Sequence, residues 1–158
     1  MSLTNAAKVD PAAVRDDWVP KAAYLDPQFA KLENERLWPR VWQVACREEE
    51  LSKPGYFVTT DVGTESFLVV RSSDNQIRAF HNVCQHRGRR LVNVTAGRTH
   101  HFTCGFHAWR SNPDASIRQI PERQDWGDKL SECEVHLKPL KVDTWGGFVF
   151  VNMDLNAK

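Results

Sequence analysis

The chain has 158 residues, of which 41% are hydrophobic, 26% charged and 10% aromatic. This composition is typical of folded globular proteins and excludes general disorder. The 21 Lys and Arg residues nearly balance the 20 Asp and Glu residues, so the formal net charge is +1. This balance argues against a nucleic-acid-binding protein and against a protein that binds membrane surfaces through its charge.

The sequence contains no apolar run near the roughly 20 residues that span a bilayer, so we expect no membrane segment. The amino-terminal stretch MSLTNAAKVDP also lacks the apolar core of a secretory signal. We therefore expect a cytoplasmic protein. The four cysteines are then expected to be ligands or buried thiols rather than disulfide partners.

The first fifty residues predict a helical arm. Asp10-Pro11 and Asp26-Pro27 each place a capping carboxylate before a proline that suits the first helical position. Two helices are expected from these signals, and the second runs from about Pro27 to Trp38 because Pro39 would stop it. We assign residues 1–50 to this arm.

From Pro54 onward, short apolar or alternating runs are separated by turn residues, which is the pattern of antiparallel β-structure. The predicted strands are Tyr56–Thr60, Phe67–Arg71, Ile77–His81, Val135–Val142 and Phe148–Asn152. The sequence therefore predicts a mainly β protein, an antiparallel β sandwich or barrel formed by residues 51–158 and preceded by the helical arm.

Two short motifs lie between the predicted strands. Cys84-Gln85-His86 and Cys104-Gly105-Phe106-His107 have the patterns C-x-H and C-x-x-H, with 17 residues between His86 and Cys104. Thiolate and imidazole groups are ligands of zinc, of iron and of iron–sulfur clusters. Because each short spacing holds both donors on one loop, we expect loops 84–90 and 104–110 to clamp one metal centre.

A structural zinc site is the alternative for these four residues, since zinc also binds two cysteines and two histidines. Zinc-finger spacing more commonly groups cysteine with cysteine and histidine with histidine. Here each loop contributes one residue of each type, which argues against a structural zinc site.

These motifs resemble the Rieske domain of the Rieske non-haem iron oxygenases that hydroxylate aromatic rings. The pattern C-x-H-x17-C-x-x-H matches the cluster motif of that family, and the flanking Asn82–Gly88 is similar to its first ligand loop. The similarity extends from about residue 20 to residue 153. Further similar segments are Tyr24-Leu25-Asp26-Pro27, Leu37–Trp42, Lys53-Pro54-Gly55 and Trp145–Asn152.

The resemblance implies a Rieske-type fold and a 2Fe-2S cluster whose two irons have different ligands. Cys84 and Cys104 would bind one iron, and His86 and His107 would bind the other. Three neighbours are expected to support the cluster from around its ligands: Arg87, Gly88 and Trp109. We expect Trp109 to shield the cluster from water rather than to relay electrons.

The resemblance also implies electron transfer within a monooxygenase or dioxygenase of aromatic hydrocarbon catabolism. A ferredoxin or a flavin and iron–sulfur reductase would supply electrons. The acceptor would be a mononuclear Fe(II) that activates O2 to hydroxylate an aromatic or other hydrophobic substrate, in a catalytic domain of the same or a neighbouring subunit. That domain needs two histidines and a carboxylate on one iron.

We expect this catalytic domain to be absent from the chain. The remaining histidines show no such arrangement with a carboxylate: His81, His100, His101 and His136. The chain alone is thus predicted to carry electrons without hydroxylating, and no catalytic residue is assigned. A free-standing Rieske-type ferredoxin is the alternative, but the helical arm argues against it because such ferredoxins resemble the β part alone.

Two further expectations concern the surroundings of the motifs. Between Cys84 and Pro113 there are five arginines and no acidic residue, which predicts a positive field around the cluster. Ala108 and Ala115 stand where the family usually has glycine, so we expect an altered second loop. Cys46 and Cys133 lie outside both loops and are expected to be buried thiols.

Overall fold

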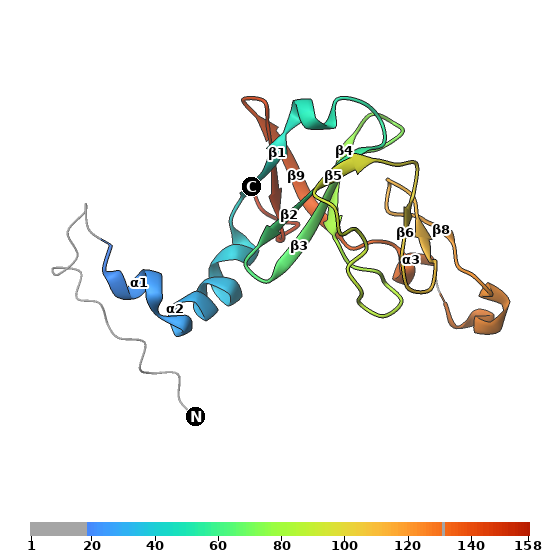
Figure 1. The fold of residues 1–158 in the computed structure, drawn as a ribbon, viewed down its shortest axis with the longest axis horizontal. Helices are drawn as coiled ribbons and strands as arrows, with labels where there is room; N and C mark the ends of the chain where they lie inside the picture. Colours follow the sequence, from blue (N-terminus) through green and yellow to red (C-terminus); the bar gives the residue numbers. More distant parts are fainter. Residues whose placement is uncertain (1–18, 131) are drawn as a thin grey trace.

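The computed structural model describes residues 19–130 and 132–158 of the chain (Figure 1). The first predicted helix, which begins near Asp10-Pro11, and the side chain of Cys133 lie outside this described part. Within it, a helical arm projects from a β body (Figure 1).

The arm contains α1 (Lys21–Leu25) and α2 (Pro27–Leu32). The Asp26 carboxylate accepts a hydrogen bond of 2.8 Å from the Gln28 amide, and Pro27 occupies the first turn, so the predicted start of this helix is confirmed. Beyond α2 the chain stays helical but changes type. A π-helical turn covers Glu33–Leu37, and a 3-10 turn covers Trp38–Arg40.

The β body contains a seven-stranded antiparallel sheet in the order β1-β10-β9-β4-β3-β2-β5. β1 also contacts β2, so the sheet curls upon itself (Figure 1). The prediction of a mainly antiparallel β fold is therefore confirmed. The strands are β1 (Gln43–Arg47), β2 (Tyr56–Val62), β3 (Glu65–Arg71), β4 (Ile77–His81), β5 (Ala96–Arg98), β9 (Pro139–Trp145) and β10 (Phe148–Asn152).

A smaller antiparallel sheet of three very short strands lies beside the large one. It consists of β6 (Phe102–Thr103), β7 (Arg110–Ser111) and β8 (Ile117–Gln119). The chain then returns to β9 through a 3-10 segment at Arg123–Lys129 and through α3 (Glu132–Val135). Another 3-10 turn, Glu48–Leu51, joins β1 to the loop before β2.

Two segments differ from the sequence prediction. Residues 43–47, expected in the helical arm, form β1, which pairs with β10 and buries Cys46. The strand predicted to begin at Val135 begins instead at Pro139, because Val135 ends α3. Val135 and Leu137 are still buried, so their alternation reflects packing rather than strand structure.

The central strands separate two hydrophobic cores. Because side chains alternate along a strand, Phe67 and Val69 of β3 enter the core inside the curled sheet, whereas Leu68 and Val70 enter the core shared with the small sheet. All four side chains are at most 1% exposed. This two-sided burial explains the uninterrupted apolar run of β3 and fixes the small sheet onto one face of the large one.

Candidate metal centre

The first ligand loop is a tight turn between β4 and β5. The Cys84 amide donates to the Arg89 carbonyl at 2.8 Å, and the Gly88 amide donates to the Cys84 carbonyl at 3.0 Å. Val83 and Arg90 form an antiparallel bridge that closes the loop. Gly88 has a φ of +69°, a left-handed conformation that glycine adopts without strain.

The second ligand loop repeats this geometry between β6 and β7. The Cys104 amide donates to the Trp109 carbonyl at 2.8 Å, and the Ala108 amide donates to the Cys104 carbonyl at 3.1 Å. Ala108 has a φ of +56°, so it adopts the conformation of Gly88 despite its Cβ. The expectation of an altered second loop is therefore wrong for the backbone. The left-handed alanine instead stores strain of about 1–2 kcal/mol.

The two loops bring like residues together. Cys84 and Cys104 are 4% and 3% exposed and belong to the same buried cluster, where their thiols are close enough to interact. The His86 and His107 rings meet with their centroids 4.6 Å apart and their planes at 72°. Each loop thus contributes one residue to a cysteine pair and one to a histidine pair.

Burial acts differently on the two kinds of ligand: it favours the neutral imidazole that a metal binds, whereas the buried thiol needs a bound metal to stabilise its thiolate. Burial raises the pKa of the Cys84 thiol, and burial followed by the neighbouring His107 lowers the pKa of His86. The Nδ1 atom of His86 is buried and has no hydrogen-bond partner among the described residues. Such an orphaned nitrogen is costly unless a metal centre engages it, and the two buried thiols beside it complete a donor set of two sulfurs and two imidazoles.

Two tryptophan side chains pack against His86. Trp109 is only 5% exposed and stacks on His86, with centroids 4.8 Å apart and an interplanar angle of 8°. Trp126 meets His86 and Trp109 edge-on at 5.6 and 5.9 Å. Trp109 therefore separates the His86 ring from solvent on one face. No local sequence signal places Trp126 here, because 18 residues lie between it and His107.

The tips of the two loops remain exposed. Phe106 is 57% exposed, and its ring lies 3.9 Å from that of His107. The Arg89 guanidinium lies 5.9 Å from the centre of the Phe106 ring, in cation–π geometry. Arg87 and Gly88 are also exposed. The histidine side of the loops thus faces solvent through an aromatic and cationic surface.

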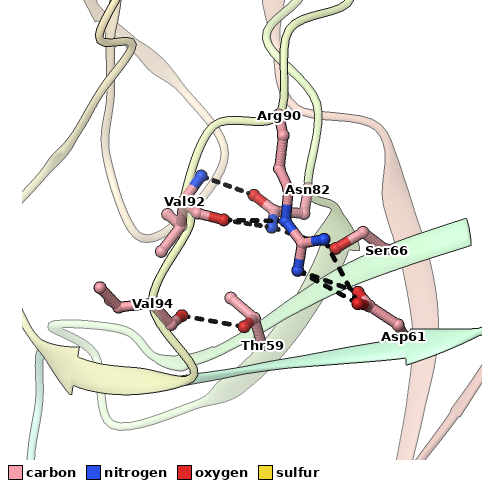
Figure 2. Close-up of polar contacts among 7 residues, drawn as sticks. All are labelled: Thr59, Asp61, Ser66, Asn82, Arg90, Val92 and Val94. Atoms are coloured by element: carbon pink, nitrogen blue, oxygen red, sulfur yellow. Dashed lines mark hydrogen bonds and ion pairs between the residues drawn. The ribbon is translucent and has the colours of Figure 1, made fainter.

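An amide clamp fixes the first loop to the large sheet (Figure 2). Asn82 is 2% exposed, and its Oδ1 accepts a hydrogen bond of 2.8 Å from the Val92 amide. Its Nδ2 donates to the Val92 carbonyl at 2.8 Å and to the Ser66 hydroxyl at 3.1 Å. This side chain therefore joins both ends of the loop to β3.

An ion pair reinforces the same clamp (Figure 2). Arg90 lies 3.0 Å from the Asp61 carboxylate and donates from Nε to the Val92 carbonyl at 3.1 Å. The Thr59 hydroxyl donates to the Val94 carbonyl at 2.9 Å. Because Asp61 neutralises Arg90, this arginine adds little to the positive field predicted from the sequence.

The other histidines lie apart from this centre. His81 in β4 lies 3.3 Å from the Glu65 carboxylate. His100 and His101 follow β5, and His136 follows α3. Among residues 19–130 and 132–158, no three His, Cys, Asp or Glu side chains gather as a site for a single metal ion.

The curled antiparallel sheet carries two equivalent hydrogen-bonded loops, in which cysteine faces cysteine and histidine faces histidine. This arrangement defines a class of β protein with a candidate two-loop metal centre. The family model of the Rieske [2Fe-2S] domain matches residues 41–142. The chain belongs to this family, whose cofactor is a 2Fe-2S cluster bound by both thiolate and imidazole.

Several relatives are oxygenase subunits. The chain is 33% identical to the carnitine monooxygenase oxygenase subunit of Acinetobacter pittii, over 87% of this chain and 37% of that protein. It is 34% identical to the benzene 1,2-dioxygenase subunit alpha of Pseudomonas putida, over 85% of this chain and 30% of that protein. The chain thus spans about a third of the length of these relatives.

The solved structures agree with this relationship. Naphthalene 1,2-dioxygenase from a Rhodococcus species superimposes with a TM-score of 0.82 at 29% identity, over 89% of this chain and 32% of that one. The similarity therefore includes the fold and is limited to the Rieske part of the oxygenase. In the described part of our chain, no helix has the length and apolar character needed to cross a membrane.

Proposed function

We propose that Cys84, Cys104, His86 and His107 ligate the Rieske cluster and that the chain acts as the electron-transfer domain of a Rieske non-haem iron oxygenase. The observation that carries this assignment is the pairing of cysteine with cysteine and histidine with histidine across two equivalent loops. When bound, such a cluster accepts and releases one electron at a time.

The residues around the ligands support this role in different ways. Gly88 and Ala108 turn the backbone so that each loop closes on its own cysteine. Trp109 and Trp126 exclude water from the His86 side, which preserves the neutral imidazole that a metal requires. Arg87 and Arg89 are exposed and give the tip of the first loop a positive charge.

The exposed tip of the second loop favours an approach of partner proteins beside His107. Phe106 offers an apolar contact beside that histidine, and the neighbouring arginines favour an acidic partner surface. We propose a ferredoxin or a flavin and iron–sulfur reductase as the electron donor. The acceptor is then a mononuclear iron in a catalytic domain of the same or a neighbouring subunit, where O2 is activated.

The substrate of the whole oxygenase is proposed only as a class. Benzene and carnitine occur in the names of the relatives, so we propose an aromatic compound or another organic molecule as the substrate.

For the domain organisation, we propose that the helical arm ends before β1 rather than at residue 50. The pairing of β1 with β10 and the start of the family match at residue 41 support this earlier boundary.

Metal and sulfide analysis tests the ligand assignment. The purified chain should contain two irons and two acid-labile sulfides and should show the absorption and EPR spectra of a Rieske centre. Cys84→Ser and Cys104→Ser should lose both, whereas Cys46→Ala should retain them, because Cys46 is a buried free thiol outside the loops. Stoichiometric zinc without iron, or loss of the cluster in Cys46→Ala alone, would refute the assignment.

The kinetics of reduction test the electron-transfer role and address the alternative of a free-standing ferredoxin. The loaded chain should be reduced by a ferredoxin and its reductase, and Phe106→Ala together with Arg89→Gln should slow this step without changing the spectrum of the oxidised centre. A free-standing ferredoxin would instead reduce a separate oxygenase and support its turnover. The relatives named above, which are oxygenase subunits, favour the first outcome.

A further inference from the structure

A second candidate site lies at the other end of the small sheet. The second ligand loop joins β6 to β7, whereas the turn Asn112–Ser116 joins β7 to β8 at the opposite end of β7. Beside this turn is a cleft of about 640 Å³. The cleft is thus separate from the metal centre, and its volume is in the range of small-molecule sites.

Four segments distant in sequence form the cleft, one of them being Ser73 in the turn between β3 and β4. The other three are the loop before β2, the end of β5 and the β7–β8 region, which includes Arg118 of β8. The Gly55 amide donates to the Arg71 carbonyl at 2.8 Å, and the Thr99 amide donates to the Gly55 carbonyl at 2.9 Å. A Cβ on Gly55 would lie 2.6 Å from the Thr99 oxygen, so this crossing requires glycine.

The opposite wall is also fixed in place. Ser72 is fully buried, and its hydroxyl donates to the Pro113 carbonyl at 2.6 Å, which holds the β7–β8 turn against the end of β3. Asn112 donates to the Ser116 hydroxyl at 2.9 Å. The same Asn112 accepts a hydrogen bond of 3.5 Å from Arg118. The cleft therefore does not depend on a loose loop.

The lining of the cleft carries an excess of positive charge. Lys53, Arg98 and Arg118 line it, and within the described part of the chain none of them has a carboxylate within 4.0 Å. Arg98 lies over the Tyr56 ring at 5.6 Å, which leaves its N–H groups available. The His100 imidazole and the Ser73 hydroxyl add further polar groups to the lining.

One carboxylate, that of Asp114, also lines the cleft. It accepts hydrogen bonds from the Ser116 amide at 3.0 Å and from the Ser116 hydroxyl at 2.6 Å. These bonds, led by that of the Ser116 hydroxyl, lower the pKa of Asp114, so it is charged at neutral pH. Three cations against one anion leave two uncompensated positive charges in the cleft.

We propose that this cleft binds a small molecule that carries a phosphate or diphosphate group. A phosphate dianion matches the two uncompensated charges, whereas a monocarboxylate would neutralise only one of them. The planar forks of Arg98 and Arg118 suit the oxygens of such a group, and Lys53 supplies a point charge. The proposal is independent of the metal centre and of electron transfer.

Calorimetric titration of the cluster-loaded chain tests the proposal, with inorganic phosphate and pyrophosphate as probes and acetate at equal ionic strength as the monoanion control. Pyrophosphate should bind at one site per chain, and acetate should not bind measurably. Arg98→Gln and Arg118→Gln should each weaken binding by about tenfold or more, since each removes a charged hydrogen-bond donor. Lys53→Gln should weaken it in the same direction.

Arg36→Gln is the matched control, because it removes the same charge from an exposed position in the arm. It should leave the affinity unchanged. The absorption spectrum and melting temperature of each variant establish that it is folded and loaded. The proposal is wrong if pyrophosphate does not bind to the unmodified chain, if Arg36→Gln weakens binding as much as Arg98→Gln, or if both cleft arginine variants retain full affinity.

Discussion

Replacement of Asn82 by alanine provides the sharpest test of how the first ligand loop is held. The substitution removes three hydrogen bonds, to the Val92 amide, the Val92 carbonyl and the Ser66 hydroxyl. At about 1 kcal/mol for each net hydrogen bond, the loss is about 3 kcal/mol. The Val92 carbonyl still accepts from Arg90, so the principal unsatisfied group is the Val92 amide.

This loss should be visible in the melting temperature. For a chain of this size, 1 kcal/mol corresponds to about 2–4 °C, so Asn82→Ala should lower the apparent melting temperature of the loaded protein by about 6–12 °C. It should also speed the loss of cluster absorption in urea. Thr59→Val is the control, because it removes a single hydrogen bond to Val94 in the same loop. A decrease below about 2 °C for Asn82→Ala, or one no larger than that of Thr59→Val, would refute the clamp.

Three further predictions follow from the same geometry. Ala108→Gly should raise the free energy of unfolding by about 0.5–1 kcal/mol. Glycine relieves the strain of the positive φ, and the larger backbone entropy of glycine cancels only part of this gain. Chemical denaturation measures this free energy, and a destabilised variant would contradict the prediction. Paired with Arg78, Asp74 has its pKa lowered from 3.8 to about 2, so its contribution to stability is complete above pH 3.8 and is lost as the pH falls toward 2. Melting curves of the native chain and Asp74→Asn should therefore converge over this interval, and a constant difference would contradict the pairing. Voltammetry should place the midpoint potential in the lower part of the Rieske range of about −150 to +300 mV, below about +100 mV, since residues 105–108 provide no hydroxyl donor for the cluster.

The parts of the fold that the sequence predicted are those with local signals. Asp26 and Pro27 mark the start of α2 because capping involves only neighbouring residues. The bounds of β4 and β10 agree with the predicted runs Ile77–His81 and Phe148–Asn152, whose residues are apolar or alternate in the usual way. Local patterns of this kind do not depend on which strands become partners.

The elements that were missed depend on contacts between distant residues. β6 and β7 contain two residues each, which is too short for any periodicity to be recognised. β1 is recognisable only through its partner β10, more than a hundred residues later. For Ala108, residue type argued against a left-handed turn, whereas the hydrogen bond of its amide to the Cys104 carbonyl determines the conformation.

The candidate site shows the same division between local and distant determinants. The two ligand motifs are each contained within four residues, so their residue types and spacing were apparent in the sequence. The partners of the ligands were less apparent. Stacking of Trp109 on His86 and the contact of Trp126 with both require the two loops to meet, and the clamp from Asn82 to Val92 requires the loop to return to its own start.

The large sheet and the metal centre depend on each other for stability. Strands of two or three residues cannot form an independent domain, yet the small sheet carries Cys104 and His107 on its β6–β7 loop. Phe102 and Trp109 therefore bury their side chains in the core shared with Leu68 and with the other residues that β2, β3 and β4 direct to this face. A cluster bound to both loops adds a cross-link between the small sheet and β4, so ligand binding and packing stabilise the same interface. Because β3 is buried on both faces, the small sheet and its ligand loop pack against a strand that the curled sheet already holds in place.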